Sequence, residues 1–251
     1  MIRPRIIPIL LLHQGALTKT IQFKKHRYIG DPINAVHLFN QMKADELVFL
    51  DIEASKEGRP IDLSLIREIG EEADMPFSVG GGITTLDQIS ACIKAGAERV
   101  ILGEVMYTNP NFVKKAVEKF GSSTISVCID YGTNWFKQTK CYYRNANKSA
   151  NIHPTQQAIQ MQDLGVGEII LQSIDRDGMM SGYDTELIED LSKTLHIPLV
   201  AVGGAGSYHD VQDLQNCTKV RGIAAGSLFI YQGKQKGVLI NYPKKNKIKG
   251  I

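Results

Sequence analysis

The sequence predicts a (βα)8 TIM barrel, an α/β fold that is built here from two similar half-barrels. Most of its expected strands are continuous apolar runs, as parallel strands with both faces covered require. A half-chain of alternating strands and helices also occurs twice, and with four strands in each half, eight strands alternate with helices. We expect a single domain over 1–251, with half-barrels at about 1–120 and 121–235 and an irregular tail at 236–251.

The repeat is clearest in two glycine-rich segments. Ile197–Gly206, IPLVAVGGAG, resembles Met75–Gly82, MPFSVGGG, at an offset of 122 residues, which carries Gly81 onto Gly203. The same offset carries Asp62 onto Asp184. Each of these aspartates stands before an apolar-periodic helix, where a carboxylate can cap the free N–H groups. A long internal period of this kind indicates a duplicated half-fold.

The eight barrel strands can be placed from the apolar runs. They are expected at Arg5–Leu12, Leu47–Ile52, Phe77–Gly80, Arg99–Gly103, Thr124–Asp130, Glu168–Ser173, Leu199–Gly203 and Gly222–Gly226. The first helix is expected at Asn34–Lys43, directly after Pro32.

Composition narrows the class of protein. The chain has 251 residues and 43% hydrophobic content, enough for one large barrel with a full core. A net charge of +3 gives no reason to expect a nucleic-acid surface. No apolar run is long enough for a membrane span, and no signal peptide is visible. We therefore expect a cytoplasmic protein that binds neither nucleic acid nor membrane.

Cysteine and histidine spacing predicts no metal site, and we also expect no cofactor. The four cysteines show no C-x-x-C spacing and are expected to be reduced and mostly buried: Cys92, Cys128, Cys141 and Cys217. The six histidines include no pair at i, i+4.

Two long segments and the end of the chain depart from a regular barrel. The connection that carries Lys19 is long enough for a lid, and 131–150 suggests a hairpin-like excursion over the active face. No amphipathic helix follows the last strand, so the final barrel helix should be shortened or replaced. The lysines near the end are expected to form a solvated tail: Lys244, Lys245, Lys247 and Lys249.

Candidate chemistry lies where the strands end, because TIM-barrel active sites form at that face. Asp51 and Asp130 close two strands, and Lys19 is within reach on the long connection. Acid and base groups of this kind serve ring closure or proton shuttling. We assign Asp130 and Lys19 as catalytic and Asp51 as a substrate contact. The alternative is that these carboxylates only cap neighbouring loops or helices.

Glycine-rich strand ends suggest phosphate binding. Gly81 and Gly82 in one half match Gly203 and Gly204 in the other. Backbone N–H groups at such glycines can approach an anion closely. The alternative is that the glycines only turn the chain, but their matching places in both halves favour phosphate.

Several motifs together carry a family resemblance. They are Arg5-Ile-Ile-Pro, Lys19, ADELVFLDI, VGGGI, CID at 128–130, GEIILQSIDRDG, GYD at 182–184 and GGAG. From Arg3 to Phe229 the chain resembles the cyclase (HisF-type) subunit of imidazole glycerol phosphate synthase. The resemblance implies a lyase-type barrel that receives ammonia from a glutaminase partner. That ammonia would be combined with a bisphosphorylated ribosyl intermediate.

The resemblance also implies site residues. Asp130 would be one of two catalytic carboxylates. One phosphate site would lie near Gly81 and Gly82. The other would be formed by Asp177, Gly178, Gly204, Gly226 and Ser227.

Two positions depart from the family pattern. Leu11 stands where the second catalytic carboxylate is expected, and leucine cannot transfer a proton. Gly103-Glu104 stands where the family has neutral phosphate donors. A carboxylate repels a phosphate unless a cation lies between them, so we expect the first-half phosphate site to be lost.

Four charged residues open strands at the opposite end of the barrel. They are Arg5, Glu46, Arg99 and Glu168, and they must pair because unpaired charges are costly to bury. They could be only a structural ring of ion pairs. In the resembled family these positions form the gate of an ammonia tunnel, with lysine in place of Arg99.

Intact gate residues beside a changed cyclase site suggest a changed ammonia acceptor. The tail segment Val238–Pro243, VLINYP, is similar to relatives of the cyclase that are associated with glycosyl amidation. That likeness implies a glutaminase partner at the amino-terminal barrel face and an ATP-dependent sugar-amidating enzyme. The substrate would be an acetamido sugar of lipopolysaccharide or a related glycan, converted to an acetamidino sugar. The alternatives are the histidine-pathway cyclase and a catalytically silent scaffold that activates the glutaminase.

Overall fold

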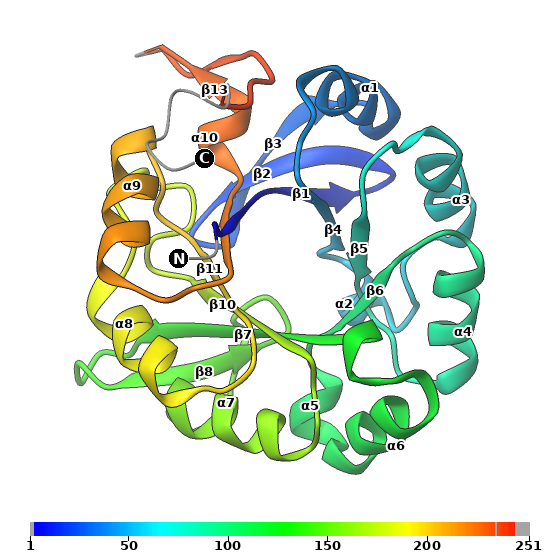
Figure 1. Cartoon of the computed structure of the whole chain (residues 1–251), viewed down its shortest axis with the longest axis vertical. Helices are drawn as coiled ribbons and strands as arrows, with labels where there is room; N and C mark the ends of the chain where they lie inside the picture. The colour runs from blue at the N-terminus through cyan, green and yellow to red at the C-terminus, as the bar shows by residue number, and fades with distance from the viewer. Residues whose placement is uncertain (1–2, 234, 244–251) are drawn as a thin grey trace.

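A computed structural model describes residues 3–233 and 235–243 and shows a closed, eight-stranded parallel barrel surrounded by helices (Figure 1). Around the barrel the strand order is β1-β4-β5-β6-β7-β10-β11-β12, and β12 pairs with β1 to close it. The strands are β1 Arg5–His13, β4 Leu47–Asp51, β5 Phe77–Gly80, β6 Arg99–Leu102, β7 Ile125–Thr133, β10 Glu168–Ser173, β11 Leu199–Val202 and β12 Gly222–Ala225. The predicted fold class is confirmed. Each strand overlaps its apolar run, although β7 continues three residues past Asp130, where it pairs with β8.

The helices form the outer layer. They are α1 Pro32–Met42, α2 Ala54–Glu57, α3 Leu63–Glu72, α4 Leu86–Lys94, α5 Val105–Thr108, α6 Pro110–Phe120, α7 Pro154–Asp163, α8 Thr185–Thr194, α9 Tyr208–Cys217 and α10 Ser227–Ile230. A short 3-10 turn, η1 at Ser122–Thr124, delays the start of β7 by one residue from its expected position. Within the described residues no helix is both long and apolar enough to cross a membrane.

Two separate apolar clusters result from the alternation of side chains along the strands. One fills the space between strands and helices and includes Phe39 and Phe49. The other fills the barrel interior with Ile7, Ile9 and Val48 among its members, and Leu11 packs against it. Alternate residues of β1 therefore face opposite sides, and its odd-numbered residues point inward.

Of the two aspartates predicted to cap helices, one makes the cap bond in the structure. Asp31 accepts a hydrogen bond from the Asn34 N–H, so the first helix starts at Pro32, two residues earlier than expected. Asp62 caps its helix through the Ser64 N–H, as predicted. The same role for Asp184 is wrong, because its carboxylate makes no cap bond.

Asp184 instead accepts a hydrogen bond from the Tyr131 hydroxyl at 3.1 Å. This hydrogen bond from a distant residue replaces the predicted cap bond to the start of α8.

Two antiparallel hairpins extend the barrel, each after the first strand of a half. The connection carrying Lys19 is not a loop: β2 Ala16–Ile21 pairs with β1, and β3 Lys24–Gly30 pairs with β2. The expected excursion at 131–150 is a hairpin in which β7 pairs with β8 Thr139–Tyr143, followed by β9 Lys148–Ser149.

The last barrel helix is shortened and replaced, as the sequence suggested. After α10 comes a small hairpin of β13 Tyr231–Gln232 and β14 Gly237–Val238, which lies between α9 and α1 in Figure 1. Tyr242 then docks on the barrel, since its hydroxyl donates to the Ile6 carbonyl at 2.9 Å and accepts from the Asp45 N–H at 3.1 Å. The predicted lysine tail, Lys244 to Lys249, lies outside the described residues.

Candidate active site

A pocket with a cavity volume of about 150 Å³ opens at the carboxyl ends of the barrel strands. The fold brings together there all the residues that the sequence assigned to catalysis and substrate binding. They are Lys19, Asp51, Gly81, Gly82, Asp130, Asp177, Gly178, Gly203, Gly204, Gly226 and Ser227. Segments from both halves of the chain therefore share one cavity.

Asp130 is the carboxylate whose proton affinity is most altered in the pocket. Burial raises the pKa of Asp130 to about 7, and the nearby Asp177 adds to the effect. The Cys128 thiol donates toward the Asp130 carboxylate at 3.5 Å and opposes this rise. A carboxyl group that titrates near neutral pH can both accept and release a proton.

Lys19 lies on β2 and is held over the interior of the barrel rather than carried on a mobile loop. Its Nζ donates to the Ile9 carbonyl at 2.7 Å. Burial lowers the pKa of Lys19 to about 8, while the negative charge of Asp177 acts in the opposite direction. The ammonium group is thus pre-placed at the pocket.

Asp177 fixes the tip of the β2–β3 hairpin to the β10–α8 loop. Its carboxylate accepts hydrogen bonds from the Thr20 hydroxyl at 2.6 Å and the Phe23 N–H at 3.2 Å. Burial raises the pKa of Asp177, although these two bonds and the charge of Lys19 lower it. Asp177 therefore couples the hairpin to the half that contains the second glycine-rich segment.

Asp51 plays a different part from Asp130. Its carboxylate accepts from the N–H groups of Glu53 and Ala54, both at 3.1 Å, and pairs with Arg59 at 2.6 Å. These contacts match the alternative of a loop cap, although Asp51 also lines the pocket. With three of its acceptor sites taken by these contacts and its charge paired with Arg59, Asp51 is a poor second acid–base group.

The two glycine pairs of the repeat adopt matching close approaches. A side chain at Gly81 would meet the Asp51 carbonyl at 2.8 Å, and one at Gly203 would meet the Ser173 carbonyl at 2.8 Å. Both residues have positive φ, +135° and +99°. No other residue fits such a position without strain. The glycines therefore serve to pack the strand ends, and phosphate binding at them stays a prediction.

The two halves differ at the position after their last strand. The 122-residue offset carries Glu104 onto Gly226, where an added Cβ would meet Lys19 Nζ at 2.1 Å. Gly226 thus leaves room for the buried lysine. The first half has a carboxylate at the corresponding place.

Arg144, which the sequence analysis did not single out, neutralises this carboxylate. Its Nε lies 2.7 Å from Glu104 Oε1, and both residues line the pocket. Next to it, Asn145 donates to the Ile52 carbonyl at 2.6 Å and anchors the turn after β8 over the pocket. The expected repulsion of phosphate by Glu104 is therefore partly cancelled. The sequence did not identify the cation beside Glu104, because Arg144 is forty residues further along the chain.

Leu11 lies on the inward face of β1 and lines the pocket. It is therefore placed where a carboxylate could have faced the cavity, and the pocket has an apolar wall there instead.

At the other end of the barrel, the four charged residues that open strands form one ring. Arg5 bonds to both Glu46 and Glu168, and Arg99 lies 3.5 Å from Glu46 and 3.7 Å from Glu168. The two glutamates are almost fully buried. The formal charges sum to zero, which offsets part of the cost of removing them from water. We call these four residues the charged ring.

Between the charged ring and the pocket, β7 contributes polar groups among apolar neighbours. Ser126, Cys128 and Asp130 alternate along one side of the strand, while Ile7 and Ile101 belong to the apolar interior. Within the described part of the chain, the buried Ser126 hydroxyl has no hydrogen-bond partner. This side of β7 can offer hydrogen bonds to a small polar molecule on the barrel axis.

Comparison with known proteins gives the family. The chain matches the family described as "Histidine biosynthesis protein" over residues 5–236. The chain belongs to this family. The match spans the barrel strands, both hairpins and the start of the tail.

Members of known sequence align with nearly the whole chain. A Vibrio vulnificus protein named "Putative imidazole glycerol phosphate synthase subunit hisF3" is 42% identical over 250 residues, covering 99% of this chain and 96% of the relative. A Leptospira interrogans protein named "Putative imidazole glycerol phosphate synthase subunit HisF" is 42% identical over 246 residues, covering 98% and 97%. The "Imidazole glycerol phosphate synthase subunit HisF" of Hydrogenobaculum sp. is 36% identical over 248 residues, covering 99% and 98%.

These relatives bear out the family resemblance and the expectation of a HisF-like enzyme subunit. None of their names mentions sugar amidation or glycan synthesis. The names therefore favour the histidine-pathway alternative over the sugar-amidation hypothesis that Val238–Pro243 suggested.

Proposed function

We propose that this family member is the ammonia-using barrel subunit of an imidazole glycerol phosphate synthase-type enzyme. One observation carries the proposal: the charged ring and the Asp130 pocket lie at opposite ends of one barrel interior, with Ser126 and Cys128 between them. A glutaminase partner would dock over the charged ring. Ammonia released there would pass along the axis and emerge beside Asp130.

Asp130 and Lys19 are the residues proposed to act on the substrate. Asp130 would take a proton from the attacking amine and return it during ring closure. The Lys19 ammonium would stabilise negative charge that develops in the same cavity. The glycines at the strand ends and Ser227 would hold the phosphoryl groups of the substrate.

The first candidate acceptor is a bisphosphorylated ribosyl intermediate, which the names of the relatives favour. Lys19 and Gly226 on one side and Arg144 on the other offer two anion contacts across the pocket. These two contacts suit a substrate with a phosphoryl group at each end.

A second candidate rests on Leu11. With Asp51 capped and Leu11 apolar, Asp130 is left without a free carboxylate partner at the end of β1. This arrangement suits a barrel that delivers ammonia to an ATP-dependent sugar-amidating enzyme rather than performing a full cyclisation.

One assay separates the two acceptors. The purified subunit is supplied with ammonia and the bisphosphorylated ribosyl intermediate, and formation of the cyclised product is followed. Turnover that depends on Asp130 supports the first candidate. Absence of turnover, with amidination of a nucleotide-linked acetamido sugar once the amidating enzyme is added, supports the second.

Replacement of Arg99 by alanine tests the passage of ammonia, which both candidates require. Arg99→Ala removes contacts at 3.5 Å and 3.7 Å from the two buried glutamates. We expect the partner to keep hydrolysing glutamine while product formed per glutamine falls. Ammonia added from outside enters at the open face and should still support the reaction.

Arg221 provides a matched control. The repeat offset carries Arg99 onto Arg221, which is exposed and forms no ion pair within the described residues. Arg221→Ala should change product formation neither with glutamine nor with added ammonia. Equal loss with glutamine and with ammonia in an Arg99→Ala protein that still binds its partner would contradict passage through the ring.

A further inference from the structure

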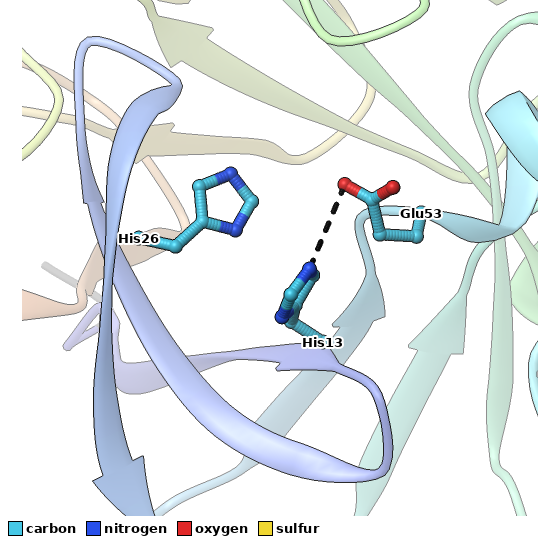
Figure 2. A group of neighbouring side chains, drawn as sticks. All are labelled: His13, His26 and Glu53. Atoms are coloured by element: carbon cyan, nitrogen blue, oxygen red, sulfur yellow. Dashed lines mark ion pairs between the residues drawn. The ribbon is translucent and has the colours of Figure 1, made fainter.

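Beside the pocket, three side chains with metal-binding atoms converge from separate elements (Figure 2). His13 ends β1, His26 lies on β3, and Glu53 directly precedes α2. One nitrogen of each imidazole and one carboxylate oxygen all lie within 4.8 Å of one another. The spacing rule applied to the sequence could not find this group, because its members are 13 and 27 residues apart along the chain.

We propose that His13, His26 and Glu53 bind a divalent transition metal ion of the zinc class. Two imidazoles and one carboxylate are a ligand set that such ions take in proteins, with water completing the coordination shell. The site would be of the open kind, since His26 is exposed and the other two residues are partly exposed.

The geometry needs only small side-chain adjustments. Ligand atoms bound at about 2.0–2.2 Å around a tetrahedral ion lie roughly 3.3 Å from each other. His13 Nε2 is 4.0 Å from Glu53 Oε1, and the rings of His13 and His26 meet edge to face with centroids 4.6 Å apart. Rotation about side-chain bonds closes the remaining distance, so no strand has to move.

The charges around the cluster leave the ligand atoms available. Lys56 lies 3.3 Å from Glu53 Oε2, whereas Oε1 is the oxygen that faces His13. The Glu53 N–H is bound by Asp51, which fixes the backbone that carries the carboxylate. One Glu53 oxygen is therefore directed at the histidines while the other is balanced by lysine.

The position of the cluster gives the metal a structural effect. His13 lies on the inward-facing side of β1, two residues beyond Leu11, and Ile52 next to Glu53 lines the pocket. Asp177 already ties the tip of the β2–β3 hairpin to one side of the mouth. A metal bound to His26 would tie the same hairpin to the opposite side and hold it closed over the pocket.

Binding of Co²⁺ to the tag-free full-length protein tests the site. We expect one ion per chain, with the visible absorption of Co²⁺ bound by nitrogen and oxygen and without a thiolate charge-transfer band. Zn²⁺ should displace it. Each of His13→Ala, His26→Ala and Glu53→Gln should weaken Co²⁺ binding by at least about 10-fold.

His37 is the matched control, because its Nδ1 pairs with Glu72 at 2.6 Å but no third ligand group joins them among the described residues. His37→Ala should leave Co²⁺ affinity unchanged. The proposal is overturned if the wild type does not bind Co²⁺, if the bound ion shows a thiolate band, or if the three ligand variants bind as tightly as the wild type.

Limited trypsin digestion tests the effect on the hairpin. Lys24 and Lys25 begin β3, directly after the turn from β2, and are exposed. Zn²⁺ should slow cleavage there in the wild type and leave the rate in His26→Ala unchanged. Equal cleavage with and without Zn²⁺, in protein shown to bind the ion, would refute the closure of the hairpin.

Discussion

Replacement of Asp130 by asparagine should stabilise the protein while it removes activity. Burial raises the pKa of Asp130 from 3.8 to about 7, so the folded state disfavours the ionised carboxylate. The unfolded chain releases this proton near pH 3.8 and the folded chain near pH 7. Between these values the folded state binds more protons, and stability falls as pH rises.

The size of the effect follows from the pKa difference. The raised pKa of Asp130 lowers the free energy of unfolding by about 1.5 kcal/mol at pH 5 and by about 4 kcal/mol above pH 7. Asp130 is partly exposed to the pocket, so water lowers both figures and they are upper values. Asparagine carries no charge. The stability gained by Asp130→Asn should therefore grow by up to about 2.5 kcal/mol from pH 5 to pH 8.

Urea unfolding at both pH values, followed by far-ultraviolet circular dichroism, measures this gain. Fluorescence is a poor probe, because Trp135 is already 94% exposed in the folded protein. Turnover of the same variant should drop by about 10²–10⁴-fold if Asp130 transfers protons.

Asp51→Asn is the control for the stability change. It removes the ion pair with Arg59 and should cost about 1 kcal/mol instead of adding stability. A stability gain for Asp130→Asn that is the same at pH 5 and pH 8 would show that its carboxylate is not destabilised by burial. Unchanged turnover would remove Asp130 from the mechanism.

Three further predictions concern other parts of the molecule. Leu11→Asp places a carboxylate at the mouth of the barrel and should raise cyclase turnover by up to about 10²-fold if the missing group limits it. Unchanged turnover with ammonia would show that the missing carboxylate does not limit the rate. Phosphate soaked into crystals should occupy the side of Gly204 and Gly226, and density only beside Gly81 would reverse the assignment. Tyr242→Phe leaves two backbone groups without their hydroxyl partner and should lower the free energy of unfolding by about 1–2 kcal/mol in urea titration. An unchanged midpoint would mean that the tail does not stabilise the barrel.

The barrel and its internal repeat could be predicted from the sequence. Apolar runs of β strands and the spacing between them are local features. Eight such units with intervening helices form a parallel sheet, and their two-fold internal repeat favours the closed barrel. The candidate pocket could be predicted for the same reason. Asp130, Gly81 and Gly203 lie at or next to predicted strand ends, and all parallel strands of a barrel end at one face. The charged ring follows likewise from residues that begin strands.

The contacts that those residues make could not be predicted in the same way. Asp51 and Asp130 both lie near the carboxyl ends of barrel strands. Arg59 and two N–H groups bind the Asp51 carboxylate, whereas the buried Asp130 carboxylate accepts a hydrogen bond from the Cys128 thiol. The pairing of Glu104 with Arg144 joins a strand end to a hairpin that is forty residues later in the chain. Local patterns record whether a residue ends a strand or caps a helix. They do not record which distant side chain folds against it, because that depends on how hairpins cross the mouth of the barrel. His13, His26 and Glu53 come together in the same way, because the pairing of β1 with β2 and β4 brings their three elements to one rim.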